Sequence, residues 1–96
     1  DATTGKPAAG VTVTLTAAGT AVAAAHTDSD GRIGGLGGEL AAGIYRLHFD
    51  TGTYFAAREV ETFYPAAIVT FTVAGEQHLH VPLLLSPFAY STYRGS

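Results

Sequence analysis

The stretch from Val11 to Ala17 reads VTVTLTA and alternates apolar with polar side chains at every step. A period of two residues is that of a β-strand, in which successive side chains point to opposite faces of a sheet. We therefore expect Val11, Val13 and Leu15 to face an apolar core, and the three threonines between and after them to face away. The pattern predicts a half-buried strand.

Three further stretches before residue 75 have strand patterns and are separated by turn residues. Thr20–Thr27 is a weaker strand, paired with the first one through an Ala-Gly turn at 18–19. The segments 44–50 (IYRLHFD) and 67–74 (AIVTFTVA) are predicted strands, and the first of them alternates large apolar side chains with Arg46 and His48. DSDGR at 28–32 predicts a turn in which Gly31 supplies a positive φ, and the glycine-rich segment 33–43 predicts a loop.

The middle of the chain predicts one short helix. Thr51 is expected to cap it, and FYP at 63–65 is expected to end it. Four aromatic residues are expected to cover one end of the core: Tyr54, Phe55, Phe63 and Tyr64.

The last third predicts two more strands. HLHVPLLL at 78–85 is expected to pair back on 67–74, with an edge or bulge at Pro82, and YSTYR at 90–94 is the last strand. Six or seven strands with turns at sandwich-like spacing predict an all-β fold, a two-sheet β-sandwich with one short helix, as a single domain over residues 1–96.

Composition excludes several classes of function. Charged residues make up only 14% of the chain and the net charge is −3, which suggests that self-association buries extra surface. The five Lys and Arg residues are spread singly, whereas a nucleic-acid binder would cluster them. The chain contains no run of 18 or more apolar residues, so we expect no membrane span. It contains no cysteine, which excludes a disulfide framework and thiolate chemistry.

Two histidines, His78 and His80, stand two residues apart in a predicted strand and therefore share a face. They are open to three interpretations: solvated strand residues, acid–base catalysis, or a metal site with Glu76 or Asp50 as a third ligand.

The turn residue Arg32 is either exposed to solvent or grips a planar, carbonyl-rich ligand with its two-pronged guanidinium. The terminal YRGS at 93–96 gathers a phenol, a guanidinium and a hydroxyl, and we expect this tail to be docked. Four other basic residues are interpreted as surface or strand-face residues: His26, Arg46, His48 and Arg58.

The chain resembles the transthyretin-related 5-hydroxyisourate hydrolase family in five stretches: TGKPAAGVTVTL, DSDGRI, YRLHFDTGTYF, FYP and HLHVPLLLSPFAYSTYRGS. The resemblance runs from Asp1 to Ser96. The closing YRGS is the discriminating motif, because transthyretin, the thyroid-hormone carrier, shares the turn and strand before it but replaces this tail. The resemblance implies a transthyretin-like sandwich and a homotetramer, with active sites where two dimers face each other across a channel.

The family reaction is hydrolysis of 5-hydroxyisourate to 2-oxo-4-hydroxy-4-carboxy-5-ureidoimidazoline, a step of urate degradation in purine metabolism that uses no metal and no organic cofactor. The resemblance therefore argues against a metal site at His78 and His80. Carried onto this sequence, it implies three catalytic residues: Arg32, His80 and Ser96. The rest of the tail motif is implied to bind the substrate: Tyr93, Arg94 and Gly95. His78 falls on a position that varies in the family.

The sequence departs from the family at its start. The family carries another catalytic histidine in a T-H-V-L-D-like strand whose end aligns with Asp1, so that this histidine would stand three residues earlier. We expect the sequence to be N-terminally incomplete, with the first strand missing from this chain, since loss of an interior strand would leave buried backbone groups unpaired. The expected compartment is the cytoplasm, with the periplasm as the alternative.

Three other functions stay open at this point: a carrier of aromatic ligands in a tetramer channel, a structural or adhesive β-sandwich module, and a catalytically inactive fragment. Tyr93 and Arg94 argue against the carrier, because they would narrow and polarise the channel. The adhesive module accounts only for the first third of the chain, where alternating Val and Thr after a Gly-Pro turn are generic.

Overall fold

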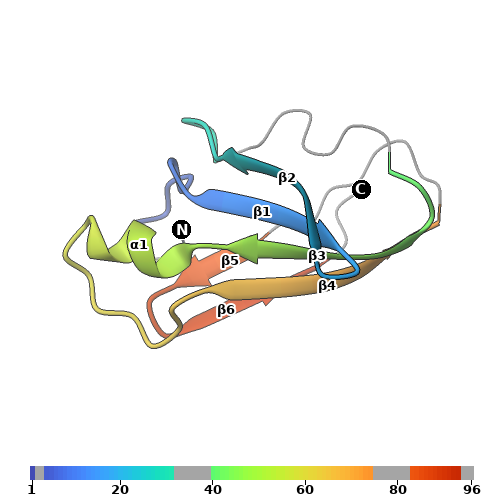
Figure 1. Cartoon of the computed structure of the whole chain (residues 1–96). Helices are drawn as coiled ribbons and strands as arrows, with labels where there is room; N and C mark the ends of the chain where they lie inside the picture. Colours follow the sequence, from blue (N-terminus) through green and yellow to red (C-terminus); the bar gives the residue numbers. More distant parts are fainter. Residues whose placement is uncertain (2–3, 32–39, 75–82, 94–96) are drawn as a thin grey trace.

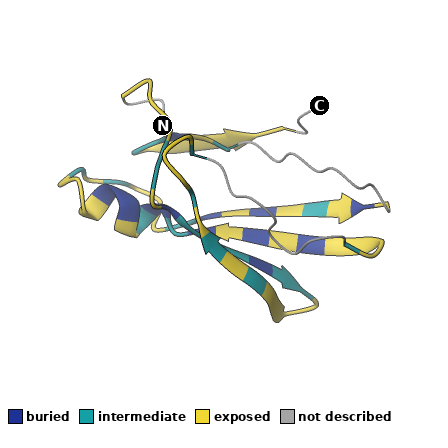
Figure 2. Cartoon of the chain, turned by 90° about the horizontal axis from the view of Figure 1, so that it is seen from above, coloured by how far each residue is buried: buried dark blue, intermediate teal, exposed yellow. Residues whose placement is uncertain are grey.

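The structure is a computed structural model that describes residues 1, 4–31, 40–74 and 83–93. Four antiparallel strands form the larger sheet in the order β2-β1-β3-β4: β1 (Thr12–Ala17), β2 (Thr20–His26), β3 (Gly43–Phe49) and β4 (Ala67–Val73). β5 (Leu83–Ser86) and β6 (Ala89–Thr92) form a second sheet, and helix α1 (Thr51–Ala56) follows β3 (Figure 1). The two sheets lie as layers in Figure 2, which confirms the predicted all-β sandwich.

The β1–β2 hairpin follows the sequence prediction closely. Val11, Val13 and Leu15 are buried, and the threonines between them are half-buried on the other face. The turn consists of Ala18 and Gly19, with φ of 51° and 80°. Two successive positive φ values are typical of the tight hairpin turn whose twist matches that of the flanking strands. Ala18 holds this conformation at a cost of about 1 kcal/mol or more, because its Cβ crowds the following carbonyl oxygen.

The core lies between the two sheets. β3 contributes Tyr45, Leu47 and Phe49, each separated from the next by an exposed residue, as the alternation predicted. Figure 2 shows this alternation of buried and exposed residues along the strands of the larger sheet. The helix adds Tyr54 and Phe55, so that it closes one end of the core.

The helix begins one residue earlier than predicted. Asp50 is its N-cap, since a side-chain oxygen of Asp50 accepts a hydrogen bond from the backbone N–H of Thr53 at 3.3 Å. The backbone N–H of Asp50 donates to the carbonyl of Thr12 at 2.8 Å, which ties the cap to β1. The prediction of Thr51 as the cap was therefore wrong: Thr51 is the first helical residue and is buried.

The helix also ends earlier than predicted. It stops at Ala56, and Glu59 adopts a left-handed φ of 58° that turns the chain four residues before Phe63. Because the backbone N–H of Val60 closes onto the carbonyl of Phe55, the helix end is satisfied without any contribution from FYP. Within the described part of the chain, no helix is long and apolar enough to cross a membrane.

The predicted pairing of 78–85 with 67–74 is wrong for the residues that the structure describes. β5 pairs with β6, and the described partner of β4 is β3. The physical reason is that β4 and β5 belong to opposite layers: Val69, Val73 and Leu85 meet in one apolar cluster through their side chains rather than through backbone hydrogen bonds. The strand residues before Leu83, and the bulge expected at Pro82, lie outside the described residues.

Two valines of the β1–β2 hairpin test how much burial in the core contributes to stability. Val13 is 0% exposed and Val22, on the neighbouring strand, is 47% exposed. We expect Val13→Ala to lower the free energy of unfolding by about 2–3 kcal/mol, from lost burial plus the cavity left behind. Val22→Ala should lower it by less than about 1 kcal/mol. Urea unfolding at a fixed protein concentration measures both, and equal losses would contradict the burial of Val13 and the exposure of Val22.

Candidate functional site

The β5–β6 hairpin places two predicted motifs at the same end. Leu83 pairs with Thr92 at the open end of the hairpin, and Ser86 pairs with Ala89 at its turn. The H-x-H-V-P motif ends directly before Leu83, and YRGS begins directly after Thr92. Leu83 and Thr92 are paired neighbours, and each motif is joined directly to one of them. Because one residue spans at most about 3.6 Å, both motifs connect to the hairpin in the same small region.

Of the predicted site residues, the structure describes only Tyr93, whose side chain is 57% exposed. The others lie outside the described residues: Arg32, His78, His80, Arg94, Gly95 and Ser96. Their meeting in one cleft therefore stays a prediction.

One large apolar side chain, Leu84, is exposed on the outer face of the hairpin. Leu84 is paired with Ser91 and is 55% exposed, while its neighbour Leu85 points the other way into the core. All residues of β6 are exposed in the single chain. The other residues on this face are small or polar: Ser86, Ala89 and Ser91.

The turn of the hairpin is fastened to the loop that follows α1. The backbone N–H of Phe63 donates to the carbonyl of Pro87 at 2.8 Å, and the hydroxyl of Thr62 donates to the same carbonyl. The ring of Tyr64 meets that of Tyr90 edge to face, with 5.1 Å between centroids. These contacts hold the hairpin at its turn, at the end opposite to the two motifs.

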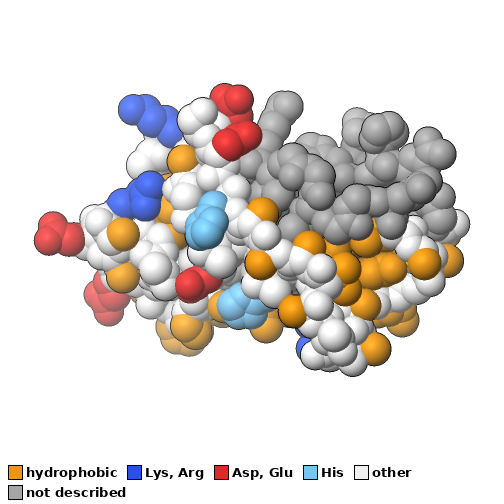
Figure 3. All heavy atoms as spheres, turned by 45° about the horizontal axis from the view of Figure 1, so that its top comes forward, with side chains coloured by type: hydrophobic (Ala, Val, Ile, Leu, Met, Phe, Trp, Pro, Cys, Tyr) orange, Lys and Arg blue, Asp and Glu red, His pale blue; other side chains and the backbone are white. Residues whose placement is uncertain are grey.

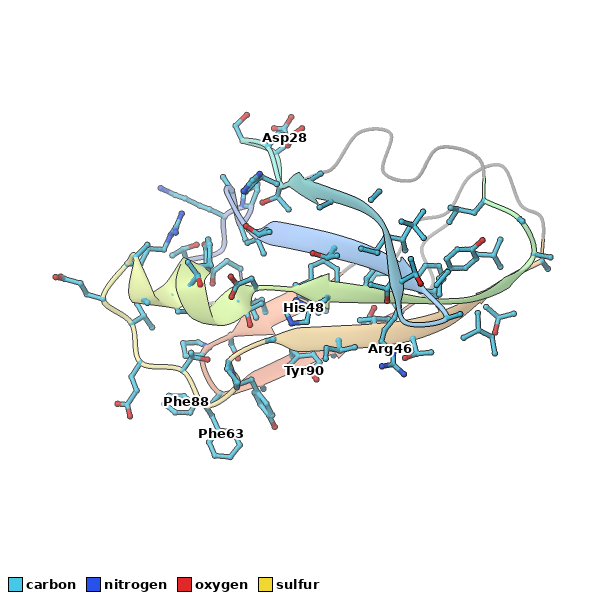
Figure 4. All side chains as sticks on the ribbon, in the orientation of Figure 1. Asp28, Arg46, His48, Phe63, Phe88 and Tyr90 are labelled. Atoms are coloured by element: carbon cyan, nitrogen blue, oxygen red, sulfur yellow. The ribbon has the colours of Figure 1, made fainter. Side chains whose placement is uncertain are left out.

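The same contacts correct a sequence prediction. Tyr54 and Phe55 are buried as expected, but Phe63 and Tyr64 are exposed, Phe63 by 70%. The loop that carries them runs past the β5–β6 turn instead of entering the core, whose end the helix already fills. Figure 4 shows Phe63 at the edge of the molecule, at the same end as Phe88.

The turn that leads to Arg32 has the predicted form. The backbone N–H of Gly31 donates to the carbonyl of Asp28 at 2.9 Å, and the N–H of Asp30 donates to a side-chain oxygen of Asp28 at 2.9 Å. Gly31 takes the expected positive φ, at 73°. The sequence did not indicate that Gly31 packs close to Pro7, or that the hydroxyl of Thr27 bonds the segment before β1. The one sequence signal for a close contact here was Gly31 itself, which stands directly before the candidate arginine.

The remaining basic residues lie on the surface, as predicted. Arg46 and His48 project from the outer face of β3, and His26 lies at the end of β2. Figure 3 shows the two described histidines on one face, with an acidic side chain between them. Within the described ranges, no three His, Asp or Glu side chains gather in a way that could hold a metal ion.

Arg58 is exposed but held in place. Its guanidinium carbon lies 3.8 Å from the centroid of the Tyr54 ring, and its nitrogens donate to the carbonyls of Tyr54 and Ala9. The hydroxyl of Tyr54 in turn donates to the carboxylate of Asp1 at 2.6 Å. These contacts join the helix to the segment before β1, which is a structural role.

The sequence matches the model of the HIUase/Transthyretin family over residues 1–95. A curated relative from Salmonella typhimurium, named 5-hydroxyisourate hydrolase, is 48% identical over 103 residues, which cover 100% of this chain and 76% of the relative.

Two solved structures resemble the fold closely. The 5-hydroxyisourate hydrolase of Klebsiella pneumoniae has a TM-score of 0.92 and 40% identity, covering 100% of this chain and 92% of that one. Sea bream transthyretin in complex with thyroxine has a TM-score of 0.89 and 38% identity, covering 99% of this chain and 88% of that one.

Proposed function

This chain belongs to the HIUase/Transthyretin family, and we propose that it is a hydrolase that opens the ring of 5-hydroxyisourate with water. The observation that carries the proposal is the similarity over the whole chain to relatives named 5-hydroxyisourate hydrolase, at 48% identity in Salmonella typhimurium. The product would be 2-oxo-4-hydroxy-4-carboxy-5-ureidoimidazoline, which places the reaction in urate degradation.

The reaction asks for a small set of groups. The oxygen of water bonds to a ring carbonyl carbon, the ring C–N bond to that carbon breaks, the released nitrogen takes a proton and the carbon becomes a carboxylate. This requires a base for the water proton, stabilisation of the negative carbonyl oxygen and a slot for a planar ring.

We assign these tasks by the family resemblance of the motifs. His80 takes the proton from water, because an imidazole changes protonation close to neutral pH. Arg32 stabilises the developing oxyanion or grips the ring carbonyls, and Ser96 orients the ring or the water by hydrogen bonds. The rest of the tail, residues 93–95, binds the ring. The register of the β5–β6 hairpin supports this assignment, since the motifs that contain His80 and Ser96 leave from its same end.

We further propose that the active form is a homotetramer in which the outer face of the β5–β6 sheet lines the channel between dimers. The exposed Leu84 on that face supports this assembly, as does the low share of charged residues, 14% of the chain. In a closed symmetric assembly every copy uses the same surface patch, so Leu84 would be buried once in each subunit.

The second candidate function is a carrier of aromatic ligands in the same channel. It is favoured by the similarity to sea bream transthyretin, whose structure holds thyroxine, and by the apolar Leu84. The phenol of Tyr93 and the guanidinium of Arg94 weigh against it, because their polar groups would line the space that an apolar ligand needs.

For catalysis, we expect His80→Ala and Arg32→Glu each to lower kcat/KM by at least ~100-fold while the circular dichroism spectrum stays unchanged. The matched controls are His48→Ala and Arg46→Glu, two exposed residues on the outer face of β3, and both should keep wild-type activity. The assay follows the absorbance decay of freshly generated 5-hydroxyisourate against its decay without protein. Wild-type activity in either site variant would refute the assignment of that residue.

For assembly, we expect Leu84→Asp to lower the molar mass measured by light scattering, because a buried carboxylate without a partner is costly. Ile44, 67% exposed on the outer face of the other sheet, gives the control Ile44→Asp, which should keep the tetramer mass. A monomeric wild-type protein, or a Leu84→Asp variant that remains tetrameric, would contradict the proposed interface.

For the choice between the two functions, titration calorimetry with thyroxine is decisive. The hydrolase proposal predicts no saturable binding near a Kd of ~1 µM, which corresponds to a binding free energy of about −8 kcal/mol. Tight binding together with no acceleration of 5-hydroxyisourate decay would establish the carrier instead.

A further inference from the structure

Thr27 joins the end of β2 to the loop that precedes β1. Its hydroxyl accepts a hydrogen bond from the backbone N–H of Val11 at 2.9 Å and donates to the carbonyl of Ala8 at 2.6 Å. Its backbone bonds on both sides, since the N–H of Gly10 donates to the carbonyl of Thr27 and the N–H of Thr27 donates to the carbonyl of Val11. One residue thus makes four hydrogen bonds to a segment at least 16 positions away in sequence.

Gly31 rests against the same loop. A Cβ atom on Gly31 would lie 3.1 Å from the Cβ of Pro7 and 3.2 Å from the backbone nitrogen of Ala8, which is closer than ordinary contact. The Asp28–Gly31 turn, which projects beyond the end of β2 (Figure 4), is therefore seated on residues 7–8, and a side chain at its last position would push these residues away by a few tenths of an ångström.

The residue that follows Gly31 in the sequence is the candidate arginine, Arg32. One peptide bond joins Arg32 to Gly31, and consecutive Cα atoms lie about 3.8 Å apart across a trans peptide, so the position of Gly31 limits where Arg32 can begin. We propose that Thr27 and Gly31 are positioning residues for Arg32: together with residues 7–8 they form a seat that limits where the arginine can begin. This inference rests on the proposed function, which gives Arg32 its role.

The seat matters because the stabilisation of a developing charge depends steeply on placement. A shift of about 1 Å in a positioned group can cost ~100-fold in rate. If Arg32 acts on the transition state, a disturbed seat lowers kcat more than it raises KM.

The first experiment compares Gly31→Ala with Gly19→Ala. Both glycines have a similar positive φ, 73° and 80°, but a Cβ on Gly19 would have nothing within 4 Å. Both variants therefore meet the same backbone penalty, and only one disturbs the seat. At a temperature where both are folded, we expect Gly31→Ala to lower kcat by ~10-fold or more and Gly19→Ala by less than ~2-fold. Equal effects would overturn the proposal.

A double-mutant cycle separates action through Arg32 from a general loss of structure. In an Arg32→Lys background, whose activity is expected to be low but measurable, Gly31→Ala should cost less than ~2-fold, because its effect has already been removed. The same ~10-fold loss in both backgrounds would overturn the proposal. Arg32→Lys on its own reports on the proposed function: full activity there would remove the role of Arg32, whatever Gly31 does.

Thr27 supplies a conservative rescue. Thr27→Val removes the hydroxyl that bonds Val11 and Ala8, whereas Thr27→Ser keeps it. We expect Thr27→Val to lower kcat severalfold with little change in KM, and Thr27→Ser to restore kcat to within ~2-fold of wild type. Wild-type kcat in a folded Thr27→Val protein would show that the seat does not position the arginine. If Thr27→Val does not fold, a low kcat in folded Thr27→Ser would count against it equally.

Discussion

Burial of one face of β1 is the constraint on which the rest of the structure depends. β1 lies between β2 and β3, and its apolar side chains belong to the same core cluster as Leu85 from the second sheet. A slip of one residue in its register would move Val13 and Leu15 to the solvent and the threonines into the core. The register of β1 therefore fixes both neighbours, and β2 in turn places the turn that leads to the candidate arginine.

The sequence predicted those parts of the fold that depend on local pattern. The alternation in β1, β3 and β4 and the Ala-Gly turn were readable, because side-chain period and turn chemistry act over a few residues. The partner of β5 was not readable, since the choice between pairing in one sheet and stacking across two layers depends on contacts far apart in sequence. The prediction that Phe63 is buried was wrong for a related reason. An aromatic residue near a helix is expected to be buried, but here Phe55 already fills that end of the core.

The candidate site was predictable only through motifs. Periodicity placed His78 and His80 on one strand face but left three interpretations open, and the family resemblance chose between them. The sequence could not indicate that Gly31 lies next to Pro7, because the two residues are brought together by the β1–β2 pairing and by the hydrogen bonds of Thr27. A catalytic residue can be recognised by its type, whereas the residues that position it are recognised by their contacts.

The strained turn at Ala18 affects the stability of the β1–β2 hairpin at the end away from the candidate site. This exposed alanine holds a left-handed backbone at the end of the β1–β2 hairpin opposite to the Asp28–Gly31 turn. Asparagine and glycine tolerate that backbone better, so the stability of the domain can be changed at this position while the Asp28–Gly31 turn stays as it is.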